Sequence, residues 1–180
     1  QLDVGLHSIE LTVTSNNGCS NSLYQDLEIY PLPMADFSAS VVCQGLETEF
    51  TDLSTGTSSY PITEWNWMID GIGPSTLQNP IYTYNTYGYN LAELGVINSA
   101  GCISQISINN ILVHPVPTAD FNFTSHFCEN DSVFFTDQSS IPVFTNDSLV
   151  SWSWTFDNGV ASGQTAGNVY DQFGDHDVVL

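Results

Sequence analysis

The stretch that decides the fold is Glu64-Trp65-Asn66-Trp67-Met68-Ile69-Asp70-Gly71. In a β-strand, side chains two positions apart lie on the same face. Trp65, Trp67 and Ile69 would therefore share one face and form the floor of a hydrophobic core. Asp70-Gly71 is a turn signal that would end the strand.

The same pattern returns further along the chain as Ser151-Trp152-Ser153-Trp154-Thr155-Phe156-Asp157-Asn158-Gly159. The chain has four Trp, and all of them lie in these two stretches. We therefore expect Trp152, Trp154 and Phe156 in a second core of the same kind. This duplication predicts a row of copied β units.

Matched motifs recur along the whole chain at nearly constant spacing. Ala-Asp-Phe, Phe-Thr-Asp, the tryptophan stretch, a Tyr-x-x-x-Gly motif and a Gly-Cys pair each occur twice. Matched pairs give a period of 83–87 residues: Cys19 and Cys102, Ala35 and Ala119, Phe50 and Phe135, Trp67 and Trp154, Gly88 and Gly174. The variation in the period would fall in loops.

The repeats predict three consecutive units. Residues 1–32 would be the C-terminal part of one unit, 33–116 a complete unit, and 117–180 the N-terminal part of a third that lacks its last strand. Tyr30-Pro31-Leu32-Pro33 and His114-Pro115-Val116-Pro117 would link them. Because proline fixes φ and cannot donate to a sheet, these links would be short and stiff, and the units would form an extended row.

Alternating patterns and turn signals predict an all-β chain, with no convincing helical period. Expected strands are residues 6–14, 23–30, 35–41, 47–54, 63–69, 81–84, 87–97 and 103–113. In the first of them, Ile9, Leu11 and Val13 are expected to face a core. About seven short strands in each complete unit indicate a two-sheet sandwich.

The composition excludes several classes of partner. The chain has no Lys or Arg and 20 Asp plus Glu, for a formal charge of −20. Binding to the nucleic-acid backbone or to anionic lipid needs cations that the chain lacks. No apolar run is long enough to insert into a membrane. A uniformly negative surface favours a salty exterior, although a composition bias of the lineage would give the same pattern.

The four cysteines are Cys19, Cys43, Cys102 and Cys128. None lies in a Cys-x-x-Cys or Cys-x-x-His pattern, which argues against a zinc site. Evenly spaced cysteines in an acidic, β-rich chain are more typical of disulfides formed in an oxidising compartment.

As an ordered set, these motifs resemble the PKD (polycystic kidney disease) repeat, an Ig-like β-sandwich. In the complete unit, the resemblance rests on Ala35-Asp36-Phe37, Phe50-Thr51-Asp52-Leu53-Ser54, Trp67-Met68-Ile69-Asp70-Gly71, Tyr84 through Tyr89, and Asn98-Ser99-Ala100-Gly101-Cys102. It covers nearly all of the chain. The Gly-Asp-Gly turn that is usual in the family is altered in both units.

The resemblance implies tandem Ig-like domains in a secreted, non-catalytic module. Versions with Val42-Cys43-Gln44-Gly45 and a Gly-Cys pair are typical of very long cell-surface adhesins and filaments of gliding and marine bacteria, commonly exported by the type IX route. The expected role is a stiff spacer and an assembly or adhesion module on the cell surface. Its partners would be adjacent repeats, further copies in a homo-oligomer or filament, and cell-surface glycans or proteins. The alternative is an accessory region of a secreted hydrolase, or a module that binds glycan or Ca²⁺.

Within such a fold the cysteines have two pairings. One Cys follows the first strand of a unit and another lies in its last hairpin, which suggests a bridge between Cys43 and Cys102. In an Ig-like sandwich these positions lie at opposite ends, farther apart than the ~7 Å Cα limit for a bridge. The alternative, which we favour, is a staple between successive units, with all four partners outside this stretch.

Two ligand-binding interpretations compete with simpler ones. The Trp pairs would suit stacking on sugar rings, but a core role is the favoured interpretation. Ca²⁺ is the one cofactor that the acidic loops would suit, because it takes carboxylate oxygens. The best-placed residues are Asp171, Asp175 and Asp177, with Asp36 and Asp120 beside the proline links. Solvated acidic loops are the favoured interpretation of these residues.

We do not expect an enzyme. The chain has no Gly-x-Ser-x-Gly and no His-Glu-x-x-His motif. His7 and His176 occupy equivalent positions of the repeat, which indicates a structural role. Asp131-Ser132-Val133 and Asp147-Ser148-Leu149 resemble the O-glycosylation signal of the same bacteria, at Ser132 and Ser148. Ordinary polar loop residues are an equally good explanation.

Overall fold

The computed structural model describes residues 3–71, 73–124, 128–144 and 146–180. Over these residues the chain consists of sixteen strands and contains no helix, as the sequence predicts. Within the same residues, no helix has the length and apolar character needed to cross a bilayer.

The chain divides into two compact units. Unit 1 comprises Gln1–Val41, Glu47–Tyr84 and Tyr89–Ile111, and unit 2 comprises Val42–Leu46, Asn85–Gly88 and Leu112–Leu180. The boundaries at residues 32 and 116 that the repeats indicate remain predictions.

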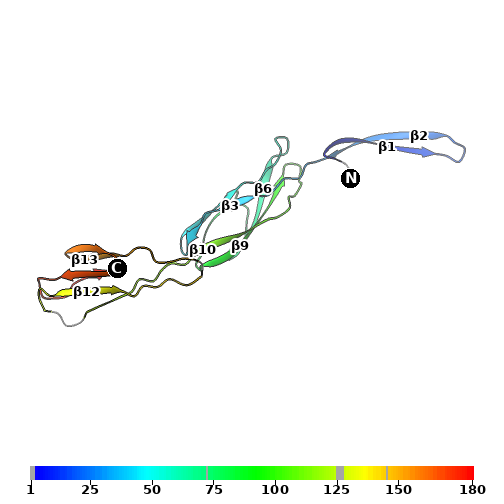
Figure 1. The fold of residues 1–180 in the computed structure, drawn as a ribbon. Coiled ribbons are helices and arrows are strands. Elements are labelled where there is room, and N and C mark those ends of the chain that lie inside the picture. Colours follow the sequence, from blue (N-terminus) through cyan, green and yellow to red (C-terminus); the bar gives the residue numbers. More distant parts are fainter. Residues whose placement is uncertain (1–2, 72, 125–127, 145) are drawn as a thin grey trace. The chain divides into compact units, whose positions relative to one another are not determined.

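Unit 1 begins with a long hairpin. Strands β1 (Gly5–Thr14) and β2 (Ser20–Ile29) pair antiparallel over their full lengths and form a two-stranded sheet (Figure 1). At the turn, the backbone N–H of Ser15 donates to the carbonyl of Cys19 at 2.8 Å. Gly18 takes φ +83°, a conformation that glycine adopts without strain.

The expectation that Ile9, Leu11 and Val13 face a core is wrong in this structure. They do share one face of β1, but their side chains are 48%, 62% and 58% exposed. The reason is that their sheet has only two strands, and a hairpin by itself encloses no core.

The rest of unit 1 is organised around an Ig-like β-sandwich. One sheet has the order β3-β5-β8, and the other has the order β4-β10-β9-β6-β7 (Figure 1). The strands are β3 (Phe37–Ala39), β4 (Val42–Cys43), β5 (Glu47–Asp52), β6 (Ile62–Ile69), β7 (Gly73–Ser75), β8 (Ile81–Thr83), β9 (Gly88–Asn98) and β10 (Ser107–His114). The division into units assigns β4 and the end of β10 to unit 2.

Trp67 occupies the centre of the unit 1 core. Its ring centroid lies 5.0 Å from that of Phe37 and 5.6 Å from that of Phe50, both in edge-to-face geometry. Its indole N–H donates to the carbonyl of Leu77 at 2.8 Å, so the buried polar atom is satisfied. Trp65 is only half-buried, so the expected row of three inward residues is in fact Trp67 and Ile69 with Trp65 at the margin.

Unit 2 repeats this arrangement with fewer strands. Its sheets have the orders β11-β12-β15 and β14-β13-β16, which match β3-β5-β8 and β7-β6-β9 of the first sandwich. The strands are β11 (Phe121–Phe123), β12 (Ser132–Asp137), β13 (Ser153–Phe156), β14 (Gly159–Ser162), β15 (Thr165–Val169) and β16 (Val178–Val179).

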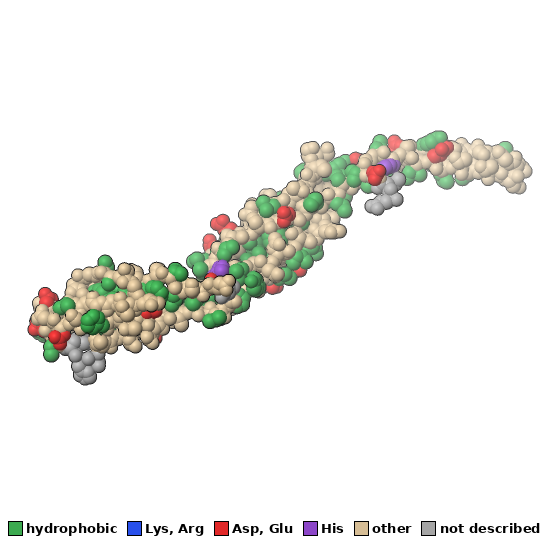
Figure 2. Space-filling view, viewed as in Figure 1, with side chains coloured by type: hydrophobic (Ala, Val, Ile, Leu, Met, Phe, Trp, Pro, Cys, Tyr) green, Lys and Arg blue, Asp and Glu red, His purple; other side chains and the backbone are tan. Residues whose placement is uncertain are grey.

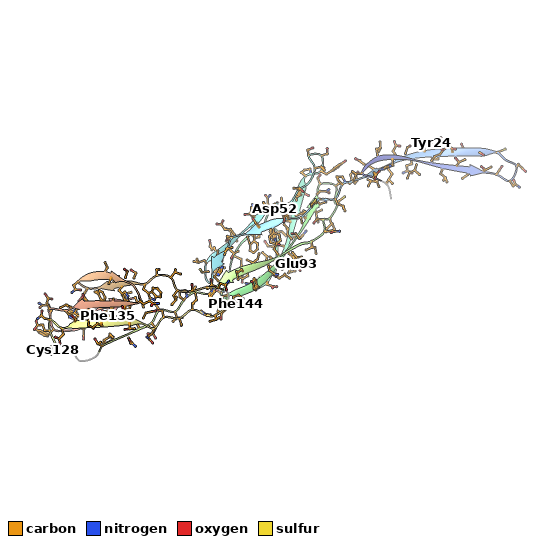
Figure 3. All side chains as sticks on the ribbon, viewed as in Figure 1. Tyr24, Asp52, Glu93, Cys128, Phe135 and Phe144 are labelled. Carbon is orange, nitrogen blue, oxygen red and sulfur yellow. The ribbon has the colours of Figure 1, made fainter. Side chains whose placement is uncertain are left out.

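Trp154 takes the place of Trp67 in the unit 2 core. It is fully buried, its centroid lies 5.3 Å from that of Phe121, and its indole N–H donates to the carbonyl of Gly163 at 2.8 Å. Phe135 of β12 (Figure 3), Phe156 and Tyr170 are the other aromatic residues of this buried cluster. Trp152, like Trp65, is half-buried.

Leu94→Ala should lower the free energy of unfolding of unit 1 by about 2–5 kcal/mol, because Leu94 is fully buried opposite Trp67. Denaturant unfolding followed by tryptophan fluorescence would measure the loss. Leu77→Ala is the matched control, because its side chain is 65% exposed. Equal losses in the two variants would contradict the assignment of the core.

Candidate functional site

The polar residues of the repeated motifs are joined in a hydrogen-bonded network at the start of the unit 1 sandwich. Ser54 Oγ accepts the backbone N–H of Asp36 at 3.1 Å and donates to the carbonyl of Asp36 at 3.2 Å. Asp36 Oδ1 accepts the N–H of Phe37 at 2.8 Å. We call this set, together with Asp52, the Asp–Ser latch.

Asp52 anchors the other end of the latch (Figure 3). Its Oδ1 accepts the N–H of Ser54 at 2.9 Å, and its Oδ2 accepts the indole N–H of Trp65 at 2.7 Å and the amide of Gln78 at 3.1 Å. Burial alone would raise the pKa of Asp52, but the hydrogen bonds outweigh burial and hold the pKa below its ordinary value.

The backbone part of this latch is built again in unit 2, whereas the indole N–H of Trp152, the counterpart of Trp65, is buried without a hydrogen-bond partner. Ser139 Oγ contacts the N–H and the carbonyl of Asp120 at 3.1 and 3.2 Å, and Asp120 Oδ1 accepts the N–H of Phe121 at 2.8 Å. Asp137 Oδ1 accepts the N–H of Ser139 at 2.9 Å, and hydrogen bonding from Ser139 lowers the pKa of Asp137. The Ala-Asp-Phe and Phe-Thr-Asp-x-Ser motifs therefore encode a structural device, and sequence reasoning missed this role.

The five candidate calcium residues do not gather at one place. Asp36 and Asp120 belong to the two latches, each with one carboxylate oxygen on the following backbone N–H. Asp171, Asp175 and Asp177 are exposed residues that follow β15. Among the residues that the structure describes, no group of three or more His, Cys, Asp or Glu could hold a metal ion. Calcium binding remains a prediction.

Unit 2 contains a cavity of about 560 Å³ beside its core. Its apolar lining includes Phe121, Val133 and Phe135, and Asp175 and Asp177 contribute carboxylates. The cavity therefore has an aromatic floor and an acidic margin.

His176, between Asp175 and Asp177 in the sequence, also lines the cavity, and both of its ring nitrogens make contacts. Its Nδ1 contacts Asp157 Oδ2 at 2.5 Å, its Nε2 contacts the carbonyl of Gln172 at 3.0 Å, and its ring stacks on Tyr170 at 4.2 Å. The hydrogen bond to Asp157, followed by that to Gln172, raises the pKa of His176.

His7 of the hairpin makes a similar contact. Its Nε2 lies 2.6 Å from the carbonyl of Asp3, four residues earlier, just as His176 Nε2 lies near the carbonyl of Gln172. This repetition supports a structural role for the histidine position.

All four cysteines are free in the structure. Cys43 is exposed in β4, Cys102 is partly buried after β9, and Cys19 is exposed at the hairpin turn. Cys128 is exposed before β12, where its N–H donates to Asp131 Oδ2 at 2.8 Å (Figure 3). The structure does not form the bridge between Cys43 and Cys102, and pairing with cysteines outside this stretch remains a prediction.

The two candidate glycosylation residues are both exposed. Ser132 is the first residue of β12, and Ser148 lies between β12 and β13. The neighbour of Ser148, Asp147, contacts His114 Nδ1 at 2.8 Å through its Oδ1. Modification of either serine remains a prediction.

Contacts that no motif indicated surround the first proline-containing segment. Tyr60 O–H donates to Glu28 Oε1 at 2.5 Å, and the rings of Tyr30 and Tyr60 meet edge to face at 5.1 Å. The hydrogen bond to Glu28 raises the pKa of Tyr60 to about 12. The side-chain amide of Asn98 donates to the carbonyl of Pro31 at 2.9 Å. Pro31 and Asn98 belong to motifs of the sequence, but no pattern indicated that they or the two tyrosines would be in contact.

No family model and no curated protein matches this sequence. Among solved structures, the chain is similar to the crystal structure of the PKD1 domain of Vibrio anguillarum Epp. The two are 17% identical with a TM-score of 0.40, over 47% of this chain and 99% of that domain.

Asp52→Asn should make the stability of unit 1 less sensitive to acid. Because the folded pKa of Asp52 is lowered, its ionised form stabilises the fold above the ordinary value of about 3.9, and this contribution is lost as the pH falls through the folded pKa. Urea unfolding between about pH 2 and 7 would measure the slope. Asp26→Asn, an exposed residue of β2, is the control. A slope unchanged from that of the original chain would contradict the latch.

Asp157→Asn should return the pKa of His176 toward its ordinary value of about 6.5. Because the folded pKa is raised, the pair stabilises unit 2 fully below that ordinary value and loses its effect as the pH rises through the folded pKa. NMR titration of the His176 ring protons would measure the change. Glu129→Gln, an exposed residue of the same unit, should leave the titration unaltered. A His176 pKa that does not move in Asp157→Asn would contradict the prediction.

Proposed function

We propose that this chain is a structural, non-catalytic segment of a large secreted surface adhesin or extracellular filament, where it acts as a stiff spacer and assembly module. The observation that carries the proposal is the duplication of the Asp–Ser latch. Asp36 and Ser54 in unit 1 and Asp120 and Ser139 in unit 2 make the same hydrogen bonds with nearly identical distances.

The latch bears on function because a protein's activity is determined by its functional site and not by its fold. The repeated polar residues are the first candidates for such a site. Here the polar side chains of the repeated motifs bond to nearby backbone groups in both units, and in unit 1 also to Trp65 at the margin of the core. The residues that recur in both units therefore hold the sandwich closed, and they do not line a cleft. This pattern favours a repeated structural spacer over a repeated catalytic or binding site.

Stiffness is supported by the surroundings of the prolines. Pro33 in the first proline segment and Pro115 in the second are both buried. Pro31 is held through its carbonyl by Asn98, and the ring of Tyr60 packs against Tyr30 in the same segment. Because proline fixes φ and these contacts hold the segment in place, the segment can adopt few conformations and should be stiff.

The charge supports an exterior location. Acidic side chains are scattered over the visible face with no basic ones between them (Figure 2). Salt and divalent ions outside the cell would screen the repulsion between neighbouring units. Export by the type IX route, calcium as a diffuse counter-ion, and adjacent repeats or surface glycans as partners belong to the same proposal.

Deleting residues 33–116 in the native protein removes one period and leaves a single proline segment. The shortened protein should still reach the cell surface, and its reach should fall by roughly 35 Å, the length of a ten-residue strand at about 3.4 Å per residue. Antibody labelling of intact cells would report export, and electron microscopy of the labelled ends would report reach. The control is Leu77→Ala, which should change neither.

Two outcomes would contradict the proposal. One is a secreted hydrolytic activity that depends on these residues while the reach does not change. The other is saturable binding of a defined glycan or of Ca²⁺ that is lost with these residues while the reach does not change, which would make the chain a binding module and not a spacer.

A further inference from the structure

In both units a loop is paired with the residue that follows the proline segment. In unit 1, Met34 and Thr55 form an isolated antiparallel bridge, with N–H to carbonyl distances of 2.9 and 2.8 Å. In unit 2, Thr118 and Ser140 form the same bridge at 2.8 and 3.0 Å. Thr55 lies in the loop between β5 and β6, and Ser140 lies in the loop between β12 and β13. We call these two loops the splint loops.

The splint loops also contact the first residue of each proline segment. In unit 1 the rings of Tyr30 and Tyr60 meet edge to face, with their centroids 5.1 Å apart. In unit 2, Nδ1 of His114 lies 2.8 Å from Oδ1 of Asp147, and the two side chains are 28% and 21% exposed. We call these two contacts the closing pairs. Each splint loop therefore holds its proline segment at both ends.

The two closing pairs occupy corresponding positions of the repeat. Tyr30 and His114 are 84 residues apart and begin the two proline segments. Tyr60 and Asp147 are 87 residues apart, and each lies five residues before the first Trp of its tryptophan stretch. Both partners differ between the units, yet the contact is made in each. The repeat therefore preserves the contact and not the residue types that make it.

The surroundings of each closing pair suit its chemistry. In unit 1, Tyr60 O–H also donates to Glu28 Oε1. The residue of unit 2 that corresponds to Glu28 is Leu112, 84 residues later, whose side chain offers no acceptor. A carboxylate in place of Tyr60 would lie near Glu28, and the two like charges would repel each other. The residues of one pair therefore cannot replace those of the other one at a time.

The splint loop of unit 1 is itself tightly folded. The N–H of Tyr60 donates to the carbonyl of Thr57 at 3.1 Å. A Cβ atom at Gly56 would lie 2.9 Å from the carbonyl oxygen of Tyr60, so this position has no room for a side chain. Because the loop is folded back on itself in this way, it can present Tyr60 at a fixed place.

We propose that the splint loops clamp the proline segments, and that the closing pairs are the contacts that keep the clamps shut. Tyr30 and Tyr60 in unit 1, and His114 and Asp147 in unit 2, are then positioning residues that work only as pairs. The inference deepens the spacer role proposed above and rests on it for its use in the native protein.

A clamp adds stiffness that prolines alone do not supply. Proline fixes φ, but ψ is left to be set by other contacts. In unit 1 the pair at Tyr30 and the bridge at Met34 hold the two ends of the proline segment against one loop. Holding both ends removes much of the remaining conformational freedom of the residues between them. The side chains of His114 and Asp147 are partly buried, so salt screens this pair less than an exposed one.

Amide hydrogen exchange followed by NMR tests the closing pair of unit 2. The reporter is the N–H of Thr118, which is bonded to Ser140 at the other end of the proline segment. His114→Ala and Asp147→Ala should each raise its exchange rate about fivefold, the factor for one hydrogen bond of ordinary net strength. The double alanine variant should raise the rate no further, because the residues act as a pair.

A tyrosine pair should restore the clamp of unit 2. The double variant His114→Tyr with Asp147→Tyr copies the closing pair of unit 1, and its exchange rate at Thr118 should return to near the original value. Asn146→Ala, an exposed neighbour in the same loop, is the matched control and should not change the rate. Rates at Thr118 that do not rise in the single alanine variants, or alanine effects that multiply in the double variant, would overturn the proposal.

The indole N–H of Trp154 separates opening of the clamp from unfolding of the unit. This group donates to the carbonyl of Gly163 in the core and should keep its protection in every variant. Equal acceleration at Trp154 and at Thr118 would mean that the whole unit opens, and it would refute a separate clamp.

Unit 1 offers an independent test with the N–H of Met34 as reporter. Tyr60→Asp removes the ring and brings a carboxylate near Glu28, so exchange at Met34 should accelerate about fivefold or more. Tyr60→Phe keeps the ring against Tyr30 and should accelerate it less. An effect of Tyr60→Phe as large as that of Tyr60→Asp would contradict the role of the ring pair.

The exchange rates and the reach of the native protein are separate measurements. Rates unaffected by the substitutions would overturn the closing pairs and leave the spacer role standing. A reach that does not fall when residues 33–116 are deleted would remove the spacer role, while the exchange rates would still decide whether the pairs keep the loops closed.

Discussion

Each of the two sandwiches depends on the burial of one indole ring between its two sheets. Trp67 and Trp154 each fill the centre of a sandwich, contact two aromatic rings of the opposite sheet, and donate their N–H to a carbonyl. A ring of this size supplies much of the apolar surface that a small sandwich has available. Because its one polar atom is satisfied, the ring can be buried completely without an unpaired donor.

The Asp–Ser latch adds polar contacts to the hydrophobic core around the indole ring. A sandwich built on one large ring still needs its first strand held in place, and β3 has only three residues. Asp36 and Ser54 tie the chain just before β3 to the chain just after β5. The carboxylate of Asp52 accepts a hydrogen bond from the indole N–H of Trp65, and so connects the latch to the margin of the core. In unit 1 the polar and apolar parts of the motif are thus joined directly, whereas in unit 2 the indole N–H of Trp152 has no hydrogen-bond partner.

The sequence predicted the class of fold and the central residues because both arise from local periodicity and repetition. Trp67 and Trp154 are buried as alternation predicts, whereas Trp65 and Trp152 lie at the margin, which alternation cannot distinguish from the interior. Strands β4 and β7 went unpredicted because two or three residues carry no period. The exposure of Leu11 depends on which strands are present beside it, and no local pattern reports that.

The candidate site was harder to predict than the fold. Asp36 and Asp120 looked available to a cation because a sequence shows side chains without their partners, and here the partners are backbone N–H groups. The cavity of unit 2 and the uncovered face of the hairpin are properties of three-dimensional packing. The repetition gave partial information on these two features, because it identified which positions of unit 2 and of the hairpin correspond to buried positions of the unit 1 sandwich.

The position of the latch has a mechanical consequence. Tension pulling on a tandem chain enters each sandwich through the peptide bonds beside its proline segment, and Met34 there is paired with Thr55 in a β-bridge next to the bonds of Asp36. These bonds would have to rupture before the pull reached Trp67. The fold thus places a set of polar crosslinks between the proline segment and its hydrophobic centre, so that a pulling force would be resisted where the chain enters the sandwich.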